Sequence, residues 1–192
     1  ALRVQLTLLL GLYGPKAHRD PAILEGYFSR RQNPKTFIIP HQEWLARTDD
    51  AFDRSREEFV KHFKTKYPDE YPPIWIACEV WDFGSMSTLF GGIKKTDQMK
   101  IASLYGIPKF QMMENWIRAM NVARNVCAHH GRLWNRPLPI TPIWPTAAEN
   151  PLLAHLINNT KSQTRTYGIA LLLQFMLKSI NPNTSWGETL KT

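Results

Sequence analysis

The chain is poor in cysteine, and the two cysteines that it has lie far apart. Cys78 and Cys127 are the only ones among 192 residues, and each lies in an apolar helical pattern. Such thiols are expected to be buried and reduced, which excludes a disulfide framework and is typical of cytoplasmic proteins. The sequence therefore predicts a cytoplasmic location.

Long apolar runs are also missing. The two most apolar stretches, Leu2 to Leu12 and Tyr167 to Leu177, are well short of the roughly 20 residues that span a bilayer. Polar residues interrupt the first stretch, and no basic segment precedes it, so it does not resemble a secretory signal. We expect no membrane partner.

Motifs for metals and nucleotides are absent too. The chain has no Cys-x-x-Cys or His-x-x-x-His pair, and Gly91-Gly92 predicts a turn rather than a phosphate-binding loop. The sequence therefore predicts neither a metal nor another cofactor.

Positive charge, by contrast, is in excess. There are 24 Lys+Arg against 16 Asp+Glu, which gives a formal charge of +8 and an isoelectric point near 9.6. Such a surplus favours a polyanionic partner, above all nucleic acid, and its alternative is an ordinary solvated basic surface.

The apolar residues follow a helical spacing rather than strand alternation. They make up 43% of the chain, so we expect one all-α domain over residues 1–192. Helices are predicted at residues 2–13, 41–66, 74–81, 85–90, 96–105, 109–130 and 162–180, with shorter ones near 21–29 and after Pro151. Gly131 should cap the helix 109–130. Four prolines from Pro137 to Pro145 forbid a helix there, so a long loop should follow.

The most informative segment lies at the end of the predicted helix 109–130. It reads Arg-Asn-Val-Cys-Ala-His-His-Gly-Arg-Leu-Trp-Asn-Arg from Arg124 to Arg136. The apolar stripe of Met113, Ile117 and Met120 continues to Arg124, and burying an unpaired guanidinium is costly. That arginine needs a partner, a phosphate or a cleft, which marks the segment as a candidate site.

The residue types in this segment suit phosphodiester cleavage without a metal. Histidine changes its charge near neutral pH, so His129 or His130 can transfer a proton. Arg124 supplies a fixed positive fork for a phosphate. Asn125 can orient either group or hold a phosphate oxygen.

Four further residues of the segment are predicted to contact RNA: Arg132, Trp134, Asn135 and Arg136. Trp134 would stack on a base. Its alternative role is a hydrophobic anchor for the loop that follows.

On one ideal helix the arginine and the histidines diverge. At about 100° per residue, Arg124 lies about 140° from His129 and about 120° from His130 in the opposite sense. A compact site then needs a bent arginine side chain, a helix that ends near Gly131, or a second subunit. The last of these predicts a homodimer.

Other chemical interpretations of the segment are weaker. Cys127 and the adjacent histidines are potential zinc ligands, but their spacing is atypical. The position of Cys127 on the apolar stripe predicts a buried thiol rather than a nucleophile. The remaining histidines are expected to be structural or on the surface: His18, His41, His62 and His155.

On these residues the chain resembles the Abi-like family of bacterial abortive-infection proteins, within the HEPN superfamily. The segment 124–136 is similar to that family's signature. The similarity extends upstream through the sequence Pro-Ile-Trp-Ile-Ala-Cys-Glu-Val-Trp-Asp-Phe-Gly at residues 73–84. The family has further helical sequence before the point where this chain starts, which raises the expectation of missing N-terminal sequence.

The resemblance implies an all-α HEPN fold, usually dimeric, with the motif residues in a cleft at the subunit interface. It also implies a metal-independent endoribonuclease of the defence or toxin type. The sequence does not identify an antitoxin or another regulatory partner that would restrain it. Arg124 and a histidine would be catalytic, with Asn125 supporting, and we favour His129 over His130. The alternatives are a non-catalytic module that holds a structured or guide RNA, and a helical interaction protein in which the segment shapes a dimer interface.

Overall fold

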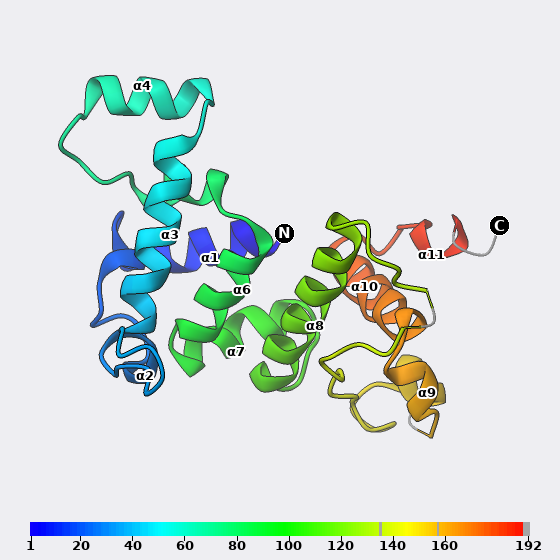
Figure 1. The fold of residues 1–192 in the computed structure, drawn as a ribbon. Helices are drawn as coiled ribbons and strands as arrows, with labels where there is room; N and C mark the ends of the chain where they lie inside the picture. Colours follow the sequence, from blue (N-terminus) through cyan, green and yellow to red (C-terminus); the bar gives the residue numbers. More distant parts are fainter. Residues whose placement is uncertain (135, 157, 190–192) are drawn as a thin grey trace. The chain divides into compact units, whose positions relative to one another are not determined.

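The computed structural model describes residues 1–134, 136–156 and 158–189, and this part of the chain is helical (Figure 1). It contains no strand; its only extended pairing is an isolated bridge between Leu24 and Ile93. The prediction of an all-α protein is therefore confirmed. Within these ranges no helix combines the length and the apolar character needed to cross a membrane.

The chain forms two compact units, residues 1–98 and 99–192, and the boundary falls inside α7 (Lys95–Leu104). The first unit contains α1 (Leu2–Gly11), α2 (Gly26–Ser29), α3 (Pro40–Arg54), α4 (Glu58–Lys66), α5 (Ile74–Ala77) and α6 (Phe83–Gly92), with 3-10 turns at Ala17–Arg19 and Cys78–Val80. Helix α1 packs on α5 and α6, and α3 packs on α2 and α6. The most deeply buried apolar side chains of this unit are at most 1% exposed, and they include Leu6, Leu10, Leu24, Trp44, Ile74, Leu89, Phe90 and Ile93.

The predicted long helix 41–66 is wrong, because the chain breaks into α3 and α4 (Figure 1). Ser55 has an extended backbone (φ −65°, ψ 136°), and so has Glu57 (φ −61°, ψ 141°). Across the break, Phe52 of α3 packs on Phe63 of α4 with ring centroids 6.0 Å apart. Both helices bury their aromatic face in this one cluster, so the helical periodicity runs through the break without revealing it.

Helix starts also differ from the prediction. Helix α6 begins at Phe83 rather than Ser85, because the Asp82 carboxylate accepts a hydrogen bond from the Ser85 N–H at 2.6 Å and caps the helix. Helix α7 begins at Lys95, and Asp97 in its first turn is buried and accepts the Tyr13 hydroxyl at 2.8 Å.

The second unit is built on α8 (Phe110–Ala128) and α10 (Thr166–Ile180), which pack on one another (Figure 1). The 3-10 helix η3 (Pro151–Leu156), α9 (Thr160–Gln163) and α11 (Trp186–Thr189) complete it. The predicted helix 162–180 is thus divided between α9 and α10. One core cluster joins α8 to α10 and to the loop between them: Ala119, Ala123, Leu138 and Ile169.

The proline-rich loop after α8 is present as predicted, and residues 137–145 form no helix. The loop is bonded to the first half of α8. The Asn115 side chain donates to the Thr141 carbonyl at 3.2 Å and accepts from the Ile143 N–H at 2.7 Å. Trp116 Nε1 donates to the Ile143 carbonyl at 2.7 Å. The loop therefore folds back along α8 and holds the chain that follows close to this helix.

Candidate functional site

Helix α8 ends just before the two histidines, and backbone hydrogen bonds close its C-terminus. His129 is the capping residue (φ −94°, ψ 22°) and His130 has a left-handed backbone (φ 54°). Gly131 N–H donates to the carbonyl of Val126 at 2.7 Å, and His130 N–H to that of Cys127 at 3.0 Å. These two bonds define a Schellman motif, in which the left-handed residue is usually glycine.

The prediction that Gly131 caps the helix is therefore wrong by one residue, because His130 takes the left-handed position. Gly131 is needed for a different reason. A Cβ atom there would lie 2.9 Å from the Val126 carbonyl oxygen and 3.1 Å from Val126 Cγ1. The chain crosses the last turn of α8 too closely for a side chain. The left-handed backbone at His130, meanwhile, costs about 1–2 kcal/mol.

Arg124 is on the surface of α8 rather than on its buried stripe. The buried face passes through Ala119 and Ala123, which pack against α10. The Arg124 side chain is exposed, and its Nη1 donates to Asn125 Oδ1 at 3.0 Å. Because the guanidinium is already solvated, it carries no burial penalty, and Asn125 holds it in position.

The buried residues of α8 end at Ala123, and Cys127 beyond them is exposed, so the predicted burial of this thiol is wrong. Cys78 is buried as predicted, and both thiols are free. Burial raises the pKa of the Cys78 thiol, and the Thr7 hydroxyl donates to its sulfur at 3.2 Å.

The other predicted site residues follow the helix end. His129, His130, Arg132, Trp134 and Arg136 are all exposed, whereas Asn135 lies outside the described residues. Trp134 is 75% exposed, so it does not anchor the loop. Leu133 and Leu138 do that instead, by packing on the α8–α10 core cluster.

The end of α8 also changes the geometry that an ideal helix implies. Angles of 100° per residue apply only as far as Ala128, and the chain reverses at His130 and Gly131. Helix α8 thus ends next to the histidines, which is the condition that one of the three predicted routes to a compact site requires.

Sequence reasoning missed the element that lies beside this segment. The Thr166 hydroxyl in the first turn of α10 donates to the Leu133 carbonyl at 2.9 Å, and Leu138 N–H donates to the Thr164 carbonyl at 2.9 Å. The predicted continuous helix 162–180 contains no helix start at Thr166, so the sequence did not reveal this contact. No local signal in the sequence pairs Thr166 with residue 133.

Charge is distributed very unevenly between the two units. Residues 99–192 carry ten Lys+Arg against three Asp+Glu, a formal charge of +7, whereas residues 1–98 carry fourteen against thirteen. The unit that holds the candidate site therefore carries almost all of the basic excess. A surface of this sign attracts phosphate groups.

The segment 124–136 itself contains no carboxylate. Within the described part of the chain, no three His, Cys, Asp or Glu side chains gather as metal ligands. The groups available for chemistry in the segment are thus imidazoles, guanidinium groups and an amide.

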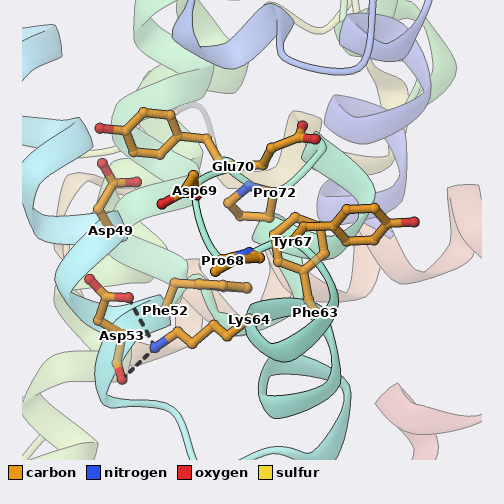
Figure 2. A pocket seen from close by; sticks show the side chains of 11 residues that line it. Asp49, Phe52, Asp53, Phe63, Lys64, Tyr67, Pro68, Asp69, Glu70 and Pro72 are labelled. Atoms are coloured by element: carbon orange, nitrogen blue, oxygen red, sulfur yellow. Dashed lines mark hydrogen bonds and ion pairs between the residues drawn. The ribbon is translucent and has the colours of Figure 1, made fainter.

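A hollow of about 450 Å³ lies in the first unit, between α3, α4 and the loop 67–72 (Figure 2). Carboxylates and aromatic rings line it, but the chain's own cations already engage several of these groups. Lys64 Nζ binds the Asp53 carboxylate at 3.0 Å and donates to the Asp53 backbone carbonyl at 2.9 Å, as the dashed lines of Figure 2 show. Arg19 binds Asp49 at 2.7 and 3.0 Å and lies over the Tyr71 ring. Ion pairs within the chain thus stabilise the walls of the hollow, and no histidine lines it, unlike the end of α8.

The remaining histidines are structural or on the surface, as predicted. His62 and His155 are exposed. His18 and His41 are each 2% exposed, and His41 Nε2 donates to the His18 carbonyl at 2.8 Å. Burial, reinforced by the Arg19 charge, lowers the pKa of His18 from 6.5 to about 3, so this imidazole is neutral at physiological pH.

The structure therefore defines an all-α protein with an exposed arginine–histidine segment at a reversing helix end. The model of the Abi-like protein family matches residues 1–135. The match covers more than half of the chain, and the protein belongs to the Abi-like family. The family is one of abortive infection, a defence against phage. No curated protein and no solved structure matches the chain.

Proposed function

We propose that the protein is a metal-independent endoribonuclease of the HEPN type. The observation that carries this proposal is the set of exposed groups at the end of α8, where Arg124 is held by Asn125 and two histidines follow directly. In the proposed reaction the 2′-oxygen of the RNA attacks the neighbouring phosphorus and the 5′-oxygen leaves, giving a 2′,3′-cyclic phosphate. RNA is required because its 2′-hydroxyl is an internal nucleophile that needs no metal-activated water.

The side chains have distinct roles in this proposal. A histidine takes the 2′-hydroxyl proton or returns a proton to the leaving oxygen, and we assign this role to His129. Arg124 stabilises the charge that develops on the phosphate, and Asn125 positions it. Arg132 and Arg136 bind the RNA backbone.

The backbone at His130 supports a functional use of this helix end. Glycine is more stable than histidine in a left-handed position, and strained residues cluster at functional sites. We propose that two copies of the chain form a homodimer with their α8 ends facing each other, so that both histidines and both arginines border one cleft.

A cleavage assay in EDTA tests the proposal. Wild-type protein should cut RNA and leave 2′,3′-cyclic phosphate or 3′-phosphate ends, and Arg124→Ala should abolish cutting. His129→Ala should lower the rate by about 100-fold or more. The control is His62→Ala, which removes an exposed histidine of α4 in the first unit. Inhibition by EDTA that Mg²⁺ reverses would refute the metal-independent mechanism.

A second candidate function is a non-catalytic module that binds RNA. The concentration of basic charge in residues 99–192 favours it, because that charge suits binding whether or not cleavage follows. Wild-type protein that binds RNA but leaves it intact in the same assay would select this alternative.

A further inference from the structure

The start of α10 lies beside the candidate site. Two hydrogen bonds join residues 133–138 to residues 164–166: Thr166 Oγ1 to the Leu133 carbonyl, and Leu138 N–H to the Thr164 carbonyl, both 2.9 Å. The family match ends at residue 135 and so does not include α10.

This pairing brings two exposed aromatic residues into the same neighbourhood. Trp134 directly follows Leu133 and is 75% exposed, and Tyr167 directly follows Thr166 and is 53% exposed. Exposed tryptophan and tyrosine rings beside a basic segment can stack on the bases of a nucleic acid, since every base offers a flat face to an aromatic ring.

Both of the paired segments carry arginines. Arg132 precedes Leu133, and Arg136 lies three residues after Leu133. Arg165 precedes Thr166. Within the described ranges none of these three arginines forms an ion pair with a carboxylate. The guanidinium groups are therefore available for phosphates.

We propose that this surface, formed by Arg132, Trp134, Arg165 and Tyr167, binds single-stranded RNA. Trp134 and Tyr167 stack on unpaired bases, and the two arginines hold the phosphates between them. A duplex is a poor ligand, because its bases are stacked on one another and present only their edges. The inference rests on the proposed function, to which it adds the class of RNA and two residues outside the family match.

Binding measurements separate this inference from catalysis. The probe is a fluorescent 12-nucleotide single-stranded RNA, with the same sequence annealed into a duplex as comparison, and the protein carries Arg124→Ala to prevent turnover. In this background Tyr167→Ala and Trp134→Ala should each weaken binding of the single strand by about 5-fold to 100-fold. Tyr167→Phe keeps the ring and should bind as the parent does.

Arg165→Ala should weaken binding and make it less dependent on salt, by about 0.7 in the slope of log K against log salt concentration. Matched controls are Lys178→Ala, at the other end of α10, and Trp75→Ala, an exposed ring of α5. Circular dichroism of each variant checks that the helices remain.

The outcomes distinguish the two proposals. Loss of single-strand binding in Tyr167→Ala, together with no cleavage by the wild type, would support this surface and refute the nuclease. Cleavage by the wild type, together with unchanged RNA binding in Tyr167→Ala and Arg165→Ala, would refute this surface and leave the proposed nuclease activity intact. Equal affinity for duplex and single strand, or no RNA binding by the parent, would overturn the inference.

Discussion

Replacing His130 by glycine should stabilise the protein while removing one imidazole from the candidate site. His130 has φ 54°, and its N–H bond to the Cys127 carbonyl is made by the backbone. Glycine keeps this bond and the bond from Gly131 to Val126. Because the His130 side chain is exposed, its removal sacrifices little packing.

The magnitude follows from two opposing terms. Relief of the left-handed conformation contributes about 1–2 kcal/mol to the folded state. The greater freedom of glycine in the unfolded chain subtracts about 0.4–1 kcal/mol. The free energy of unfolding of His130→Gly should therefore rise by about 1 kcal/mol.

Urea denaturation followed by tryptophan fluorescence measures this change, and His129→Gly is its matched control. His129 has φ −94°, so glycine relieves nothing there and only the unfolded-state term remains. His129→Gly should lower the free energy of unfolding by about 0.4–1 kcal/mol. If both variants were destabilised equally, the assignment of His130 as the strained residue of the Schellman motif would be wrong. Cleavage by the stabilised His130→Gly protein then shows directly whether its imidazole takes part.

Two further predictions concern the first unit. Gly92→Ala should destabilise it by about 1–3 kcal/mol, because the new Cβ would lie 2.2–2.6 Å from atoms of the buried Phe28 ring; Gly11→Ala, where nothing lies within 4 Å, is the control, and equal melting temperatures for both would contradict the steric argument. Stability should also fall as the pH drops below about 6.5, by about 1.4 kcal/mol per pH unit down to about pH 3, because the lowered pKa of His18 means that only the unfolded chain takes up its proton there. Urea midpoints of the wild type and His18→Phe between pH 7 and pH 4 check this, and parallel pH dependences would show that another group is responsible.

Helical periodicity was enough to predict the fold class and most helices of this chain. It failed where the pattern continues through a change of direction. Residues 55–57 separate α3 from α4, although the aromatic faces of the two helices pack against one another in one cluster. Periodicity indicates which residues are buried, and it does not indicate whether those residues belong to one helix or to two.

The sequence predicts a candidate site at the end of α8, but it does not predict which residues there are buried. Arg124 and Cys127 continue the spacing of Met120, yet both are exposed. The stripe of Met113, Ile117 and Met120 is buried as predicted, and the last buried residue of α8 is Ala123. Periodicity predicts which side of a helix faces the core, and it does not predict where along the helix the burial ends.

The position of the site segment also depends on residues that are remote in sequence. Leu138 and Ile169 pack on Ala119 and Ala123 of α8. The Leu133 carbonyl accepts a hydrogen bond from a side chain in the first turn of α10. The family match ends at residue 135, so these supports come from the part of the chain beyond it. Arginine and histidine at the end of α8 define the chemistry that is possible there. The chain beyond residue 135 packs on that helix and adds the further groups that lie beside the segment.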